Sequence, residues 1–275
     1  MRCAWKELLA ILPVHLRGEV DRLGKEGMQE LRLRINSPPE LVLTGKRQWL
    51  SGSSTKEDLN FVINAASKYS PWRASTVAQG YITAPGGHRI GLCGEAICRN
   101  GVFEGIREPT SLCIRVARDY PGIANLAEGI SGSILILGAP GWGKTTLLRD
   151  LIRLVCQKQH VAVLDERNEL FPEGFTRGRG MDVMLGCPKH QGIGILLRTM
   201  GPECIAVDEI TEEEDCSALV LAANCGVRLL ASAHASGMVD FRQRRVYRKL
   251  VETRIFDALL ILRQDKSCYV ERMML

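Results

Sequence analysis

Residues 138–145 read GAPGWGKT and match the phosphate-binding pattern G-x4-G-K-(S/T) at every fixed position. A strand-like run, Ser133 to Leu137, precedes them, and a helix-like run, Lys144 to Val155, follows. In that order, backbone N–H groups and the helix start point at phosphate oxygens. Lys144 can then reach the β- and γ-phosphates of ATP, and the Thr145 hydroxyl can ligate Mg²⁺. The predicted nucleotide-binding residues are Gly138, Ala139, Pro140, Gly141, Trp142, Gly143, Lys144, Thr145 and Thr146.

Two other apolar runs end in carboxylates. Residues 204–207 lead into Asp208 and Glu209, and residues 161–164 lead into Asp165, Glu166 and Arg167. Beside a phosphate loop, Asp208 is predicted to hold Mg²⁺, directly or through water, and Glu209 to polarise the attacking water. Glu166 is expected near the metal, at the carboxyl edge of the same sheet. A solvated turn or a helix start explains either acidic pair equally well when it is taken alone.

A further strand-like run, residues 230–233, ends at His234. At that position an imidazole can donate a hydrogen bond near the γ-phosphate and sense the state of the nucleotide. Thr211 and Glu214 form the pattern of a capping box, so a helix is expected to begin there and to close at Gly226.

Short apolar strands separated by helix-length segments characterise residues 119–275, which predicts an α/β domain with a mostly parallel sheet covered on both faces. Residues 1–118 have a different texture and predict a small α+β N-terminal domain. Alternation over residues 31–35 indicates a half-buried strand, and residues 80–97 form a hairpin pattern around Pro85-Gly86-Gly87. Helices are expected over residues 5–12 and from residue 55 to about Tyr69, and a further strand over residues 111–116.

The composition is that of a soluble globular protein, with 45% hydrophobic residues, 24% charged residues and a net charge of +5. This mild basic excess does not indicate a dedicated nucleic-acid binder. The ten cysteines include no C-x2-C pair, so zinc is not expected, and we predict reduced, mostly buried thiols. No apolar run approaches the ~20 residues that span a bilayer, so we expect a cytoplasmic protein without a transmembrane segment.

Several boxes in a fixed order resemble the secretion ATPase superfamily, the RecA-like motors of type II and type IV secretion and of type IV pili. The resemblance is closest to its stage III sporulation branch, from endospore-forming bacteria. It spans residues 80–235 and is carried by GYITAPGGHRIGLCG, SLCIRVAR, GKTTLLRDLIR, LDERNEL, MDVMLGCPKHQG, LLRTMGPECIAVDEI and GVRLLASAHA. Two features depart from the pattern: residues 199–202 read Thr-Met-Gly-Pro where Ser-Met-Ser-Pro is expected, and Trp142 is bulky for a loop position. Neither change removes a catalytic group.

The resemblance implies a RecA-like ATPase that uses ATP and Mg²⁺ in the cytoplasm of the mother cell. It also implies a homo-oligomeric ring, with a hexamer as the expected form. The ring would work with membrane proteins of a channel between mother cell and forespore and associate with the membrane through them. Lys144, Thr145, Asp208, Glu209, Glu166 and His234 carry over from the matching boxes. Arginine fingers of this superfamily come from the N-terminal domain, where Arg89 and Arg115 are both candidates. The choice between those two arginines stays open, as does the choice between Glu209 and Glu166 as the base.

Three other functions are compatible with a phosphate loop. A RecA-like nucleic-acid motor is disfavoured because only 5% of the residues are aromatic, too few for a track that stacks single-stranded bases, so no stable nucleic-acid binding is expected. A nucleotide-gated scaffold that does not hydrolyse ATP is disfavoured by the intact carboxylates. A phosphotransferase is the weakest alternative, because the sequence reveals no acceptor pocket.

Overall fold

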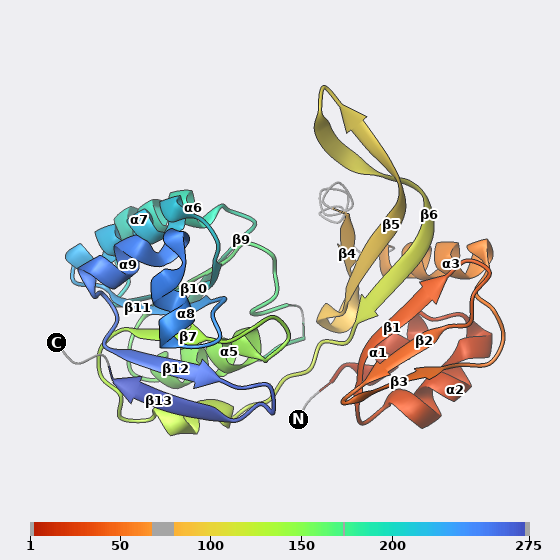
Figure 1. The fold of residues 1–275 in the computed structure, drawn as a ribbon, viewed down its shortest axis with the longest axis horizontal. Helices are drawn as coiled ribbons and strands as arrows, with labels where there is room; N and C mark the ends of the chain where they lie inside the picture. The colour runs from red at the N-terminus through yellow and green to blue at the C-terminus, as the bar shows by residue number, and fades with distance from the viewer. Residues whose placement is uncertain (1–2, 68–79, 173, 273–275) are drawn as a thin grey trace. The chain divides into compact units, whose positions relative to one another are not determined.

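The computed structural model describes residues 3–67, 80–172 and 174–272, which form two compact units (Figure 1). The first unit comprises Met1–Asp119 and Glu173–Phe175, and the second comprises Tyr120–Pro172 and Thr176–Leu275. Within the described ranges, no helix has both the length and the apolar content needed to cross a membrane.

An antiparallel sheet of six strands organises the first unit, in the order β3-β2-β1-β6-β5-β4. The elements of this unit are α1 (Trp5–Ala10), α2 (Val14–Gly24), β1 (Met28–Arg34), β2 (Glu40–Leu43), β3 (Lys46–Trp49), α3 (Lys56–Ser67), β4 (Tyr81–Thr83), the 3-10 turn η1 (Pro85–Gly87), β5 (Arg89–Arg99) and β6 (Val102–Arg115). The predicted hairpin around residues 85–87 is confirmed, because β4 and β5 pair antiparallel across that turn.

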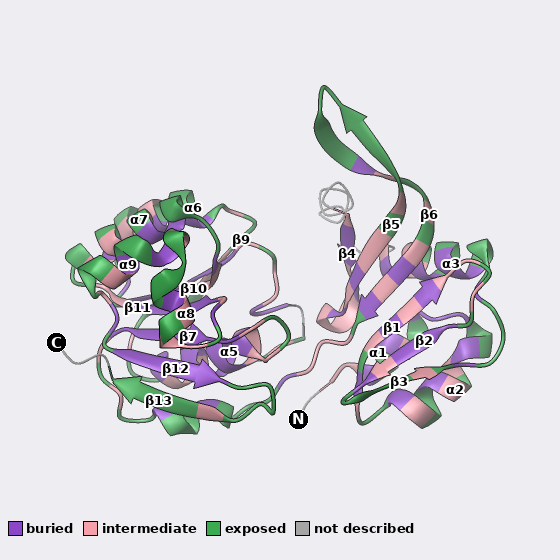
Figure 2. Cartoon of the chain, in the orientation of Figure 1, coloured by how far each residue is buried: buried purple, intermediate pink, exposed green. Residues whose placement is uncertain are grey.

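Period-2 alternation places the core of this unit on one face of its sheet. Leu31 and Leu33 of β1 are buried, whereas Arg32 and Arg34 point to the opposite face. The three helices supply further apolar side chains to the same hydrophobic cluster, Leu8 of α1 among them. Figure 2 shows the buried stretches of these strands and the exposed outer part of the β5–β6 hairpin.

Seven strands form the sheet of the second unit, in the order β13-β12-β7-β11-β10-β8-β9. Every neighbouring pair is parallel except β12 and β13. The elements are η2 (Ile123–Ala127), β7 (Ile134–Leu137), α5 (Lys144–Val155), β8 (Val161–Asp165), β9 (Met181–Leu185), α6 (Lys189–Thr199), β10 (Cys204–Ile210), α7 (Glu213–Asn224), β11 (Arg228–Ala233), α8 (Met238–Gln243), η3 (Arg245–Tyr247), α9 (Arg248–Thr253), β12 (Ala258–Leu262) and β13 (Cys268–Arg272).

Helices cover both faces of this sheet, which explains the continuous apolar strands. Alternate residues of β7 feed two separate clusters. Leu135 and Leu137 pack with side chains of α6 to α9, and Ile134 and Ile136 pack with side chains of α5 and η2. The predicted α/β fold with a mostly parallel sheet and a preceding α+β part is therefore confirmed.

Three expectations about local features need correction. The capping box of α7 is formed by Glu212 and Asp215 and not by Thr211 and Glu214, because the acidic run offers more than one pair at that spacing and the first helical residue is Glu213. The closing turn at Gly226 is confirmed by its left-handed φ of 81°. The thiols are not mostly buried: all ten cysteines are free, but only Cys156, Cys204 and Cys216 are buried, and Cys93, Cys98 and Cys225 are exposed.

The remaining differences concern lengths. The strand expected over residues 111–116 is only the end of β6, which runs from Val102 to Arg115 and pairs with β5 over most of its length. Helix α3 ends at Ser67 within the described residues, and the expected extension to Tyr69 lies outside them.

Candidate nucleotide site

The phosphate loop connects β7 to α5 as the motif predicts. Gly141 and Gly143 have φ values of 75° and 103°, a region of backbone space that favours glycine. Ala139 O accepts the Trp142 N–H at 3.2 Å and lies 3.3 Å from Lys144 Nζ. The Trp142 side chain packs on the hydrophobic cluster beside α5. The loop therefore has the left-handed turns that a phosphate cradle requires.

Four adjacent parallel strands carry the other predicted residues of the second unit. The strand order β7-β11-β10-β8 brings the phosphate loop, His234, the Asp208–Glu209 pair and Glu166 to the same carboxyl edge of the sheet. Residues nearly a hundred positions apart in the sequence become neighbours there.

His234 links the phosphate-loop lysine to the proposed base. Lys144 Nζ lies 2.8 Å from His234 Nδ1, and His234 Nε2 lies 2.6 Å from Glu209 Oε1. An ammonium can only donate, so Nδ1 accepts and the imidazole proton sits on Nε2, from which it is donated to Glu209. Burial lowers the pKa of Lys144, against the opposing effect of the Glu209 and Asp208 charges.

Asp208 is held by hydroxyl groups on both of its carboxylate oxygens. Thr145 Oγ1 donates to Oδ2 at 2.9 Å, and Ser232 Oγ donates to Oδ1 at 2.8 Å. Thr145 and Asp208 thus present a hydroxyl and a carboxylate side by side, which are the hard oxygen donors that Mg²⁺ prefers. These two residues fit a Mg²⁺ ion that is completed by waters and substrate phosphates.

Tyr247 fixes the end of the histidine strand. Its hydroxyl accepts the backbone N–H of His234 at 3.2 Å and donates to Ile210 O at 3.3 Å. Burial raises the pKa of Tyr247, so this hydroxyl keeps its proton. The ends of β11 and β10 are thereby tied together, which sets the distance between His234 and Glu209.

A second acidic group lies at the end of β8. Glu166 Oε2 lies 2.5 Å from Lys189 Nζ, whose side chain is only 7% exposed and which also lies 3.8 Å from Asp215 Oδ2. Lys189 is the first residue of α6, a position that a helix dipole disfavours for a cation. The two carboxylates offset that cost, so Lys189 connects Glu166 to the start of α7.

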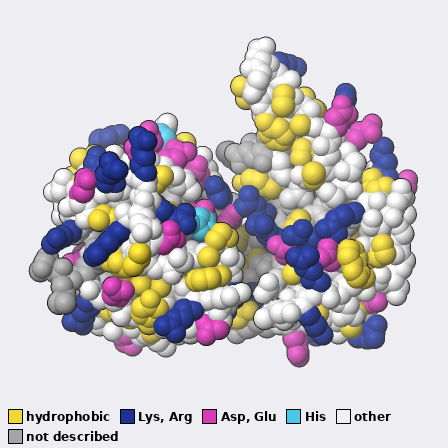
Figure 3. All heavy atoms as spheres, viewed as in Figure 1, with side chains coloured by type: hydrophobic (Ala, Val, Ile, Leu, Met, Phe, Trp, Pro, Cys, Tyr) yellow, Lys and Arg dark blue, Asp and Glu magenta, His cyan; other side chains and the backbone are white. Residues whose placement is uncertain are grey.

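The predicted arginine fingers lie in the first unit. Arg89 of β5 and Arg115 of β6 are direct partners in the antiparallel ladder. Arg115 Nε lies 3.4 Å from Glu30 Oε1, and Arg89 stacks over the Tyr81 ring at 4.0 Å. On the visible face of this unit, basic and acidic side chains gather over the sheet (Figure 3).

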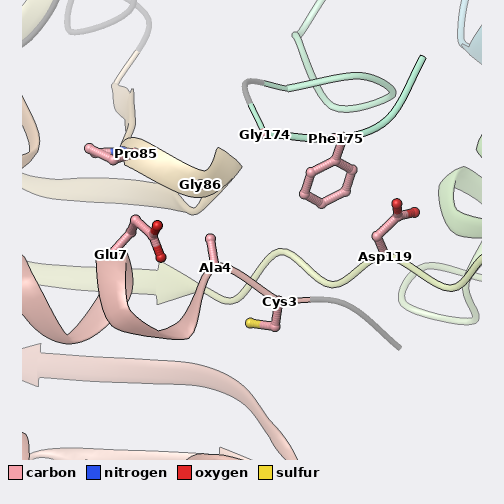
Figure 4. Close-up of a pocket in the computed structure, with 8 residues that line it drawn as sticks. All are labelled: Cys3, Ala4, Glu7, Pro85, Gly86, Asp119, Gly174 and Phe175. Carbon is pink, nitrogen blue, oxygen red and sulfur yellow. The ribbon is translucent and has the colours of Figure 1, made fainter.

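A separate cavity of about 380 Å³ is lined by residues of the first unit (Figure 4). Its lining residues are Cys3, Ala4, Glu7, Pro85, Gly86, Asp119, Gly174 and Phe175. None of these is a predicted site residue.

The sequence did not indicate the roles of Ser232, Tyr247 and Lys189, or the ion pair between Arg167 and Glu209. Arg167 Nη1 lies 4.0 Å from Glu209 Oε2. Its position directly after Glu166 was the one sign that Arg167 lies near the site. Ser232 and Tyr247 gave no signal, because a serine in a strand and a tyrosine in a basic segment have many ordinary structural uses.

Comparison with known proteins agrees with this architecture. The family model for sporulation stage III, protein AA matches residues 5–271. Stage III sporulation protein AA of Bacillus subtilis (strain 168) is 36% identical over 283 residues, covering 95% of this chain and 92% of that protein.

Two solved structures share the fold. The Legionella pneumophila ATPase DotB has a TM-score of 0.60 and 18% identity, covering 95% of this chain and 80% of its own. The pilus retraction motor PilT with bound ADP has a TM-score of 0.61 and 14% identity, covering 93% and 80%. At these identities the likeness establishes that the chain shares the fold of these two proteins.

Proposed function

The chain belongs to the sporulation stage III protein AA family, and we propose that it is a Mg²⁺-dependent ATPase of the secretion ATPase type. The observation that carries the proposal is the hydrogen-bonded chain Lys144–His234–Glu209, with the Thr145–Asp208 pair beside it. A phosphate lysine, a metal-binding oxygen pair and a carboxylate for water meet at one sheet edge, which is the set that phosphoryl transfer to water needs.

Each residue has a defined part in the proposed reaction. The loop N–H groups and Lys144 bind the phosphates. Thr145 and Asp208 would hold Mg²⁺, which would neutralise charge on the phosphate oxygens. Glu209 accepts the proton of the attacking water while the bond from the γ-phosphorus to the bridging oxygen of ADP breaks. His234 releases Lys144 to the phosphates and keeps its Nε2–H directed at Glu209, so it couples phosphate occupancy to the orientation of the base.

Glu166 supports this reaction from β8, with Lys189 holding its carboxylate. We keep Glu166 as the alternative base, since its side chain is 37% exposed and only its Oε2 is bound by Lys189.

The proposed cellular role follows from the family and the shared fold. The chain acts as a homo-oligomeric ring, a hexamer, in the cytoplasm of the mother cell, where it energises or assembles a channel to the forespore through membrane proteins. An arginine of one subunit, Arg89 or Arg115, completes the site of its neighbour. In this proposal the ring does not bind nucleic acid stably and does not move along it.

The test is phosphate release from ATP by the full chain with Mg²⁺, with EDTA, and with single-stranded DNA. We expect release that requires Mg²⁺ and does not respond to DNA. ATP binding without any phosphate release would instead support the nucleotide-gated scaffold, and strong stimulation by DNA would support the nucleic-acid motor.

A further inference from the structure

The turn between β12 and β13 has an unusual residue at a position that suits glycine. Arg263 N–H donates to Ser267 O at 2.9 Å, and Lys266 N–H donates to Arg263 O at 3.0 Å, which makes a tight hairpin. Asp265 accepts the Ser267 N–H at 2.9 Å and stabilises the turn. Lys266 has a φ of 69°, the left-handed conformation that hairpins of this kind usually give to glycine.

A lysine in this conformation costs backbone energy that glycine would avoid. The turn does not need the Lys266 side chain, because its hydrogen bonds come from backbone groups and from the side chains of Asp265 and Ser267. A side chain that is retained at a strained position is expected to do something that glycine cannot.

The Lys266 side chain reaches the phosphate loop. Its ammonium donates a hydrogen bond to Gly141 O, across 125 residues of sequence and within the second unit. Partial burial lowers the pKa of Lys266. Gly141 itself has a left-handed φ of 75°, and a Cβ placed on it would meet no atom of the described residues within 4 Å, apart from its chain neighbours. The hydrogen bond from Lys266 therefore acts on a part of the loop that has no side chain of its own.

We propose that Lys266 is a positioning residue of the nucleotide site. It holds the phosphate loop through Gly141 O in the conformation that receives the polyphosphate of ADP or ATP, and it adds a positive charge beside those phosphates. This inference rests on the proposed nucleotide site. Among the residues that the structure describes, the Lys266 ammonium is hydrogen-bonded to Gly141 O and to no residue assigned to the water or the metal, so it acts on nucleotide binding and leaves the chemical step unchanged.

The test is equilibrium binding of ADP with Mg²⁺, together with kcat and KM for ATP and the Tm of each variant. Lys266→Gly removes the cation and relieves the backbone. We expect ADP affinity and 1/KM to fall about tenfold, as for loss of a charged hydrogen bond, with kcat within about twofold and Tm equal to or above that of the wild type. Lys266→Arg keeps the cation and is expected to bind ADP as the wild type does.

Arg254 provides a matched control. It is an exposed cation with a left-handed φ of 51° at the end of α9, and we assign it no part in the nucleotide site. Arg254→Gly makes the same exchange of cation for glycine, and it should leave ADP affinity unchanged.

Three results would overturn the inference. Lys266→Gly could bind ADP as tightly as the wild type; its Tm could fall together with its affinity, which indicates a merely structural role; or Arg254→Gly could lose affinity by the same factor. Wild-type chain that binds neither ADP nor ATP would remove the proposed function itself, a result that is distinct from all three.

Discussion

Glu209 is held in a backbone conformation that a glutamate adopts only under constraint. Its φ is 28°, and its N–H donates to Asp208 Oδ1 at 2.9 Å and to Ser232 Oγ at 3.0 Å. Such strain is most often kept where it aims a functional group. Here it directs the carboxylate at His234, so the backbone and the histidine together fix its direction, and this supports Glu209 over Glu166 as the base.

Replacing Glu209 by glutamine tests that assignment. Glu209→Gln keeps the size of the side chain but cannot accept a proton, so hydrolysis should slow at least ~100-fold while ATP binding persists. Phosphate release and equilibrium ATP binding measure the two effects separately. Glu166→Gln is the matched control, and if that variant alone shows the loss, the two carboxylates have exchanged roles.

The segment between β8 and β9 is anchored by one buried carboxylate. Asp165 accepts the N–H groups of Glu169, Leu170 and Phe171 at 2.8, 2.9 and 3.1 Å. Arg149 of α5 donates to the carbonyl oxygens of Glu169, at 2.7 Å, and Leu170. Asp165 therefore binds N–H groups, and Arg149 binds C=O groups, of the segment that follows Glu166.

This anchor predicts a pH dependence of stability. Burial raises the pKa of Asp165 to about 6 from 3.8, although the N–H donors and Arg149 act in the opposite direction. The folded state therefore holds the proton more tightly than the unfolded state. The stability this proton contributes is complete below pH 3.8 and is lost as the pH rises to about 6.

Urea unfolding of the wild type and of Asp165→Asn across pH 4 to 7 measures the contribution of the Asp165 proton to the free energy of unfolding. The stability of the wild type relative to the variant should fall by roughly 2 kcal/mol over that range, because part of the effect is already lost at pH 4. A difference between the two that does not change with pH would show that Asp165 has an ordinary pKa.

Local motifs and element order could be predicted, and distant contacts could not. The β7–loop–α5 unit was evident because a buried parallel strand is continuously apolar and the loop glycines lie within one short segment. The outer part of the β5–β6 hairpin was missed because exposed strands such as residues 95–107 have no buried face to impose alternation. Lys189 and Lys266 act across 23 and 125 residues of sequence, where spacing carries no signal.

At the scale of the whole molecule, the proposed catalytic groups divide between the two units. The arginines lie on β5 and β6 of the first unit, and the phosphate loop and carboxylates lie on the second. If an arginine acts on a neighbouring copy, activity per chain must rise with protein concentration. Such a finger is worth ~10³–10⁵ in rate in other phosphate-loop enzymes.

Mixing two inactive variants tests this assembly. Arg89→Ala should bind ATP but hydrolyse it poorly. Adding Glu209→Gln should restore part of the activity, because an intact Glu209 then meets an intact Arg89 at hybrid interfaces. Phosphate release at several mixing ratios gives the readout, with mixed rings verified by co-purification of an untagged variant with a tagged one. If every ratio stays inactive, Arg89 is not the finger and Arg115→Ala is tested in the same way.

The central claim is that the phosphate loop of the second unit binds and hydrolyses ATP, and Lys144→Ala tests it most directly. This variant removes the cation that His234 and Ala139 O hold at the loop. We expect phosphate release to disappear and ATP affinity to fall sharply, with the circular dichroism spectrum of the wild type retained. Turnover and ATP affinity equal to those of the wild type would contradict the account.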